Sequence, residues 1–195
     1  MTDYQKIYNE KKGTVAEALA IISDGDYLAP GYCANEPFTI LGQLHTLQDR
    51  EDIHKIRILY SLANGDYPFF EDAYKDTFSL DSYFFGSTNR RLYQNGRCSY
   101  IPVNLHEATK RKDSHDGPNV YIGSATPMDK HGYMRISLCN MIDRHYMDQA
   151  EKIILEINPN LPVVNGDTEI HIRDVDRIVE LNTPLPTIKQ NRKRG

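Results

Sequence analysis

One short segment decides how this chain is interpreted: Pro127-Met128-Asp129-Lys130-His131-Gly132-Tyr133. Pro127 introduces a turn, and Gly132 permits a backbone conformation in which neighbouring amide groups stand open to a ligand. Lys130 is cationic and His131 titrates near neutral pH, so this pair is suited to holding a carboxylate or a thioester oxygen. The same residues also fit a tight hairpin whose polar side chains face water. Local sequence leaves both interpretations open.

Strands and helices are predicted to alternate on both sides of this segment. Strand-like runs occur at 27–32, 56–62, 80–85, 100–103, 119–125, 133–139 and 152–157, with weaker candidates at 170–172 and 178–181. Helices are expected at 14–22, 36–47, 88–95, 105–112 and 143–150, the first of them opened by a Thr14–Glu17 capping box. Because parallel strands need crossover helices, this order predicts an α/β domain with an open, mainly parallel sheet and helices on both faces.

Ligands gather outside the carboxyl ends of the strands in open sheets of this kind. The candidate loops are therefore 31–36, 86–89 and 126–132, each of which follows a predicted strand. In the first loop, Gly31 lets the backbone approach a ligand and the next helix begins with free amides. The alternative is an ordinary strand-to-helix turn in which Glu36 favours the helix dipole.

Composition is that of one globular domain. The chain has 195 residues, with 39% hydrophobic and 26% charged residues. The net charge of −4 gives no basic field for nucleic acid or membrane surfaces. No apolar run approaches the roughly 20 residues that cross a bilayer, and the polar first residues lack a secretory signal. We therefore expect a cytoplasmic protein.

Metal and nucleophile patterns are weak. Cys33, Cys98 and Cys139 are odd in number and scattered, which suits reduced thiols, and no base accompanies Cys33 to make it a nucleophile. His106-Glu107 lacks the second histidine of a zinc-protease helix. Neither a metal site nor a phosphate-binding or serine-hydrolase motif is predicted.

Several longer runs carry a family resemblance. They are the segment from Pro127 to Tyr133, Ile153-Ile154-Leu155-Glu156-Ile157-Asn158-Pro159-Asn160-Leu161-Pro162, Gly96-Arg97-Cys98-Ser99-Tyr100-Ile101-Pro102-Val103 and Gly166-Asp167-Thr168-Glu169-Ile170-His171. Together they resemble the amino-terminal domain of the acetyl-CoA hydrolase/transferase family, which includes the butyrate, acetate and 4-hydroxybutyrate CoA-transferases. The likeness implies a CoA-transferase-like domain over residues 1–186. Residues 187–195 are then a basic tail or a severed interdomain linker.

The resemblance implies a chemistry that this chain holds only in part. In the family, a glutamate of the carboxy-terminal half attacks the acyl-CoA, and CoA then passes to a free carboxylic acid without metal or redox cofactor. No residue here matches that glutamate, so no catalytic residue is assigned and the isolated chain is expected to be inactive. The family pattern implies that the acyl-CoA pocket is bordered by Gly31, Tyr32, Ala34, Glu36, Pro37, Lys130, His131 and Gly132.

Expected partners are an acyl-CoA, a short-chain carboxylate, the missing carboxy-terminal half and, through an uncovered interface, a second copy of the chain. Arg90 and Arg91 could contact CoA phosphates by charge, with solvated surface as the alternative. Three other functions remain open: an acyl-CoA hydrolase half, a non-catalytic binding or assembly module, and a sugar-phosphate isomerase-like enzyme. The last needs an acid/base pair that the sequence does not reveal.

Overall fold

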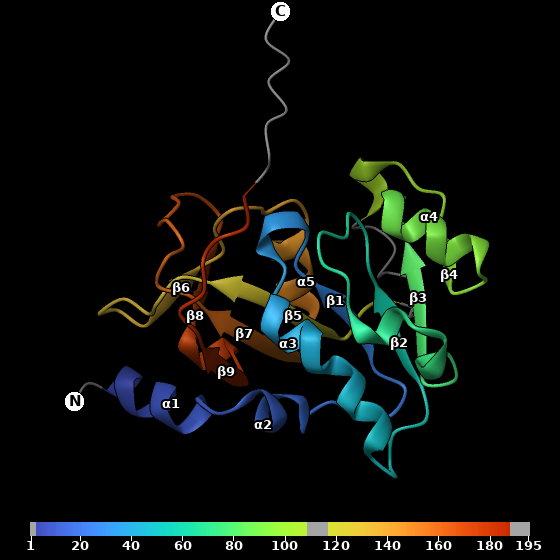
Figure 1. The fold of residues 1–195 in the computed structure, drawn as a ribbon. Helices are drawn as coiled ribbons and strands as arrows, with labels where there is room; N and C mark the ends of the chain where they lie inside the picture. The colour runs from blue at the N-terminus through green and yellow to red at the C-terminus, as the bar shows by residue number, and fades with distance from the viewer. Residues whose placement is uncertain (1–2, 109–116, 188–195) are drawn as a thin grey trace, which may run out of the picture.

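Seven parallel strands form the central sheet (Figure 1). The structure is a computed structural model, and it describes residues 3–108 and 117–187. The strands of the sheet are β1 (Tyr27–Pro30), β2 (Ile56–Leu59), β3 (Phe78–Ser82), β4 (Cys98–Tyr100), β5 (Val120–Ala125), β7 (Lys152–Ile157) and β9 (Arg177–Glu180). Their order across the sheet is β4-β3-β2-β1-β5-β7-β9, and every neighbouring pair is parallel. The predicted α/β domain with an open parallel sheet is confirmed.

The strand order in the sheet reverses between β1 and β5, because successive strands lie on opposite sides of this point. From β1 the chain adds β2, β3 and β4 on one side, and it later adds β5, β7 and β9 on the other. The carboxyl ends of the neighbouring strands β1 and β5 therefore form a topological switch point, where open α/β sheets bind ligands. Loops 31–36 and 126–132 leave the sheet from these two strand ends.

Helices cover both faces, as predicted. They are α1 (Asp3–Lys11), α2 (Val15–Leu19), α3 (Phe38–Gln43), α4 (Ser87–Gln94) and α5 (Asp143–Gln149). Side chains alternate along β1, so Leu28 packs in a cluster with residues of α2 and α3, while Ala29 packs in a second cluster with residues of α5. Figure 1 shows α3 in front of the sheet and α5 behind it. Within the described residues, no helix is long and apolar enough to cross a membrane.

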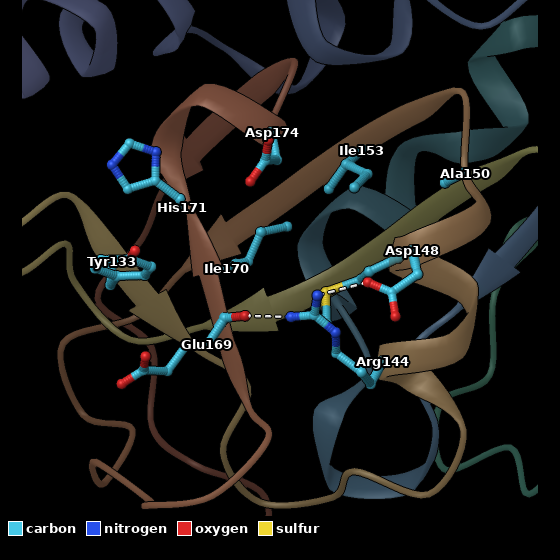
Figure 2. A pocket seen from close by; sticks show the side chains of 10 residues that line it. Tyr133, Arg144, Asp148, Ala150, Ile153, Glu169, Ile170, His171 and Asp174 are labelled. Carbon is cyan, nitrogen blue, oxygen red and sulfur yellow. Dashed lines mark hydrogen bonds and ion pairs between the residues drawn. The ribbon is translucent and has the colours of Figure 1, made fainter.

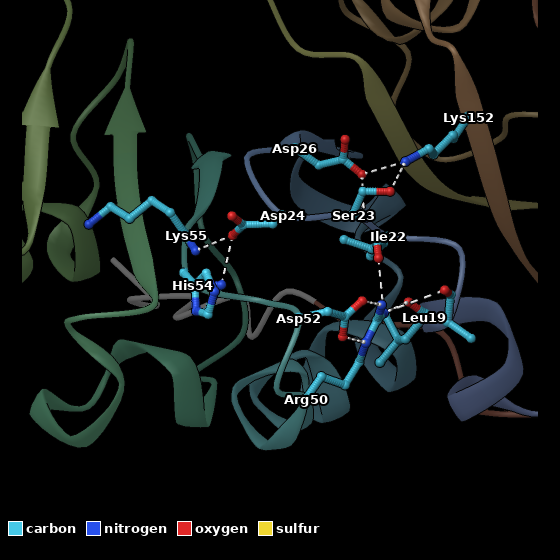
Figure 3. A network of polar contacts seen from close by, with 11 residues as sticks. Leu19, Ile22, Ser23, Asp24, Asp26, Arg50, Asp52, His54, Lys55 and Lys152 are labelled. Atoms are coloured by element: carbon cyan, nitrogen blue, oxygen red, sulfur yellow. Dashed lines mark hydrogen bonds and ion pairs between the residues drawn. The ribbon is translucent and has the colours of Figure 1, made fainter.

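A polar network ties together the amino ends of three strands (Figure 3). Just before β1, Asp26 accepts a hydrogen bond from Lys152 at 2.7 Å, where β7 begins. Asp24 accepts from the backbone amides of His54 and Lys55, just before β2, at 2.7 and 2.6 Å. The Arg50 guanidinium donates to the Ile22 carbonyl at 2.9 Å. These charged groups lie at the amino ends of the strands, whereas the switch point lies at the carboxyl ends, and their bonds stabilise the fold there.

Several predicted elements differ from the structure. The strand expected at 100–103 is shifted toward the amino terminus, because β4 spans Cys98–Tyr100 and residues 101–104 form no strand. The strand expected at 133–139 is only three residues long: β6 (Tyr133–Arg135) pairs antiparallel with β8 (Glu169–His171) in a separate two-stranded sheet. Alternating apolar residues fit either sheet, so the pattern could not reveal the partner. The helix expected at 36–47 ends sooner, because a 3-10 helix (Leu44–Asp49) follows α3 directly. Of the helix expected at 105–112, residues 105–108 form a 3-10 turn and the others lie outside the described residues.

The first helix, α1, was not predicted. Tyr8 is its one fully buried residue, so the apolar stripe that marks a helix in sequence is almost absent. Its position depends on distant contacts: the Tyr8 hydroxyl donates to Glu180 at 2.7 Å, and the Lys11 ammonium donates to the Ile172 carbonyl at 3.0 Å. The other short helices are 3-10 turns at Cys33–Asn35, Pro68–Phe70, Asp72–Tyr74 and Ile172–Asp174.

Candidate functional site

The loop after β1 makes a tight turn that requires glycine at position 31. The Gly31 amide donates to the Ile122 carbonyl of β5 at 2.8 Å, so the loop begins in contact with the neighbouring strand. Asn35 then folds back over it. A Cβ atom on residue 31 would lie 2.5 Å from the Asn35 carbonyl oxygen and 2.7 Å from its side-chain nitrogen. The backbone of this loop is therefore fixed by close packing.

Substitution Gly31→Ala is expected to destabilise the fold by about 1–3 kcal/mol, because the added methyl group collides with Asn35 and the loop must move. Gly42→Ala is the matched control, since Gly42 lies within helix α3 and a Cβ there meets nothing within 4 Å. The control should gain roughly 0.5–1 kcal/mol from helix propensity. Urea unfolding of both variants measures the difference, and equal stabilities would contradict the close packing at Gly31.

Buried polar groups tie the loop to α5. The Asn35 side-chain amide donates to the Tyr121 hydroxyl at 3.3 Å and to the Asp143 carboxylate at 3.2 Å. Tyr121 donates to the same carboxylate at 2.8 Å. Burial raises the pKa of Asp143, and the hydrogen bond from Tyr121 partly offsets this shift. Asp143, at the start of α5, is therefore bonded to the loop after β1 and to β5 at the switch point.

Glu36 is completely enclosed and is only 1% exposed. Its carboxylate accepts four hydrogen bonds: from the Tyr60 and Tyr67 hydroxyls at 2.8 and 2.7 Å, and from the Asn64 and Gly65 amides at 2.6 and 3.1 Å. Burial raises the pKa of this carboxyl, while the four donors act in the opposite direction. Glu36 therefore clamps the segment after β2 to the candidate loop, and a direct contact with substrate stays a prediction.

The helix-dipole alternative for Glu36 is wrong, because Glu156 on β7 occupies that position instead. One Glu156 oxygen accepts from the Thr39 and Ile40 amides at the start of α3, at 3.0 and 3.1 Å. Glu156 is 3% exposed, and burial raises its pKa to about 7. Sequence reasoning missed this residue. The available signal was a lone acidic residue inside the apolar run from Ile153 to Ile157.

The remaining predicted residues of this loop differ in exposure. Tyr32 and Pro37 are buried, and Ala34 is half-buried. Cys33 is half-buried as well, and its thiol contacts that of Cys139. Burial raises the pKa of both thiols, that of Cys139 to about 12. These thiols are therefore poorly ionised at neutral pH, which agrees with the absence of a nucleophilic cysteine.

The second predicted group forms a self-contained turn. Asp129 accepts from the amides of His131 and Tyr133 at 2.9 and 3.0 Å, and its own amide donates to the Tyr133 carbonyl at 2.8 Å. Gly132 has a φ of +89°, which favours glycine, and it packs against His171. The Lys130 and His131 side chains are exposed.

A hollow of about 510 Å³ lies next to this turn, between β8 and α5 (Figure 2). Tyr133 and His171 line one part of it, and Arg144 lies on the opposite side. The Arg144 guanidinium is already engaged, since it donates to the Glu169 carbonyl at 2.6 Å and pairs with Asp148 at 2.5 Å. Arg144 therefore already has partners within the protein on this side of the hollow.

The two predicted groups contact different parts of the fold within the described residues. Loop 126–132 starts beside the first group, where the Ser124 hydroxyl donates to the Glu36 carbonyl at 3.1 Å. Its turn then lies against Tyr4 of α1 and His171 of β8. Figure 1 shows the β5–β6 connection projecting beyond the end of β5. Binding of substrate by Lys130, His131 and Gly132 stays a prediction.

Comparison with known proteins identifies the class to which this fold and site belong. Residues 1–189 match the acetyl-CoA hydrolase/transferase N-terminal domain. The chain is therefore a member of this family, as its motifs indicated.

The relatives that it matches are more than twice as long as this chain. The chain is 28% identical over 185 residues to a succinyl-CoA:cyclohexane-1-carboxylate CoA transferase of Geobacter metallireducens, covering 95% of this chain and 42% of the relative. It is 25% identical to the 4-hydroxybutyrate coenzyme A transferase of Clostridium kluyveri, covering 94% and 42%. The crystal structure of RipA from Yersinia pestis superposes with a TM-score of 0.88 at 29% identity, covering 97% of this chain and 46% of RipA. The chain thus spans less than half the length of these relatives.

Proposed function

We propose that this chain is the amino-terminal part of a CoA-transferase that moves CoA between a short-chain acyl-CoA and a free carboxylate. The observation that carries the proposal is the family match over nearly the whole chain, together with relatives named as CoA transferases. The closely packed loop at the β1–β5 switch point lies where sheets of this kind bind their ligands, which supports the proposal. In this proposal Gly31–Pro37 forms one wall of the acyl pocket.

None of the three buried carboxylates near this loop is suited to be the nucleophile, which supports a function in which another part of the protein supplies it. Transfer through a covalent acyl intermediate needs an accessible nucleophile. Glu36 is enclosed by four donors, Asp143 is fully buried, and Glu156 caps α3. Each of the three already has a structural partner. The family resemblance implies that the nucleophilic glutamate comes from a carboxy-terminal half, and in this proposal CoA is the substrate and no metal or redox cofactor takes part.

The purified chain alone is expected to show no transfer above the buffer rate. Butyryl-CoA and isotopically labelled acetate are incubated with it, and labelled acetyl-CoA is measured by chromatography. Addition of the carboxy-terminal part of the Clostridium kluyveri relative, or of a second half encoded immediately downstream, is expected to produce transfer. Turnover by the chain alone would contradict the proposal, and so would inactivity with a folded and stably bound partner half.

A further inference from the structure

A second hollow lies on the other side of the switch point, at the carboxyl ends of β3 and β4. Its volume is about 470 Å³, and its lining is aromatic except for one arginine: Tyr83, Phe84, Phe85, Tyr93, Tyr100 and Arg90. The Phe85 ring contacts the Tyr93 ring with centroids 5.3 Å apart and the Tyr100 ring at 5.0 Å. Phe85 therefore holds the two tyrosines in place.

Three of these aromatic side chains are unusually exposed. Phe84, Tyr93 and Tyr100 are 58%, 55% and 50% exposed. Single exposed apolar residues are common on proteins, but a gathered and hollowed aromatic surface marks a binding site. The rings come from the end of β3, from α4 and from β4, so the fold brings them together from separate elements.

Arg90 supplies the one charge in the lining. Its Nε atom donates to the Phe85 carbonyl at 3.3 Å, which anchors the side chain beside the aromatic surface. Among residues 3–108 and 117–187 no carboxylate is paired with it. Arg91 on the same helix differs, because it forms an ion pair with Asp66 at 3.0 Å. Arg90 therefore offers free guanidinium donors to an anion at the edge of the hollow.

We propose that this hollow binds the adenine nucleotide end of CoA, with the adenine ring stacked on the exposed tyrosines and a phosphate held by Arg90. Aromatic side chains stack on nucleobases without needing base-specific hydrogen bonds, and guanidinium groups bind phosphate oxygens strongly. The volume falls within the roughly 300–1,000 Å³ of small-molecule sites. The pantetheine arm is neither aromatic nor charged, so the nucleotide end is the part of CoA that matches this lining.

The hollow also lies at a suitable distance from the acyl pocket proposed at the Gly31–Pro37 loop, and this step rests on the proposed function. Neighbouring strands lie about 4.8 Å apart, so β3 is about 10 Å from β1 across the sheet. An extended pantetheine arm can bridge that distance. With its nucleotide in the hollow, CoA can place its thioester beside the Gly31–Pro37 loop.

Calorimetric titration of the full chain with ADP, CoA and pantetheine tests the proposal. We expect ADP and CoA to bind saturably with similar affinity and pantetheine not to bind. Arg90→Ala and Tyr93→Ala should each weaken ADP binding about tenfold, because they remove the phosphate contact and a stacking surface. Both side chains are exposed, so the variants should fold, and circular dichroism checks this. Arg91→Ala is the matched control and should bind ADP as the unmodified chain does.

The proposal is overturned if ADP fails to saturate the chain, or if Arg90→Ala and Arg91→Ala bind it equally well. Failure to bind ADP would leave the hollow as a surface for a protein partner. The proposed function is judged separately, by acyl transfer in the reconstituted two-half enzyme. If that enzyme is active and its KM for butyryl-CoA is unchanged by Arg90→Ala, the nucleotide site is wrong and the transferase function stands.

Discussion

Replacement of Glu36 by alanine is expected to destabilise the folded chain by about 4 kcal/mol. Two tyrosine hydroxyls and two backbone amides lose their acceptor at once, and a buried donor left without a partner costs on the order of 1 kcal/mol or more. The side chain also leaves a cavity among Tyr60, Tyr67 and their neighbours. Urea unfolding followed by circular dichroism measures the change in the free energy of unfolding.

Two further variants separate the hydrogen bonds from the general effect of mutation. Glu36→Gln keeps one acceptor oxygen and nearly the same volume, so it should fall between the unmodified chain and the alanine variant. Glu71→Ala removes an exposed glutamate and should change stability by less than about 0.5 kcal/mol. A loss below about 1 kcal/mol for Glu36→Ala would show that the four donors find other partners, and the clamp would then be wrong.

The centre of the sheet was predictable because β1, β5 and β7 are buried on both faces. The strand Val120–Ala125 is buried at every position, and Lys152–Ile157 at all but its first. Such strands appear in sequence as continuous apolar runs, and their alternation with helices determines a parallel arrangement. The capping box at Thr14 and Glu17 was likewise a local signal, and both of its hydrogen bonds are present.

The hydrogen bonds of Glu36 and the small β6–β8 sheet could not be predicted, because they join residues that lie far apart in the sequence. Glu36 follows β1, whereas its four donors follow β2, so they come within hydrogen-bonding distance only because β1 and β2 are neighbours. The donors are Tyr60, Asn64, Gly65 and Tyr67. The pairing of β6 with β8 joins segments separated by the whole of α5 and β7. The motif around Gly132 was recognisable as a family signature, but its location against α1 and β8 followed only from three-dimensional contacts.

Stability of the chain is expected to depend on pH through Glu156. Its pKa rises from 4.5 to about 7 on folding, mainly because burial disfavours the charged form. The folded chain therefore holds this proton more tightly than the unfolded chain between these two values. The stabilisation is fully present below pH 4.5 and is lost as the pH rises through 7, by about 3 kcal/mol in total.

Substitution Glu156→Gln should remove this dependence and keep the cap. The glutamine carbonyl oxygen can still accept from the Thr39 and Ile40 amides, but it has no proton to lose. The free energy of unfolding is measured by urea at several values from pH 4.5 to 8 for both proteins. Other titrating groups, including Glu36 and Asp143, are common to both and cancel in the difference. We expect equal stability at pH 4.5 and a relative gain of about 3 kcal/mol for the variant by pH 8. Parallel pH profiles would show instead that Glu156 keeps an ordinary pKa, because the two amide donors at the start of α3 compensate fully for its burial.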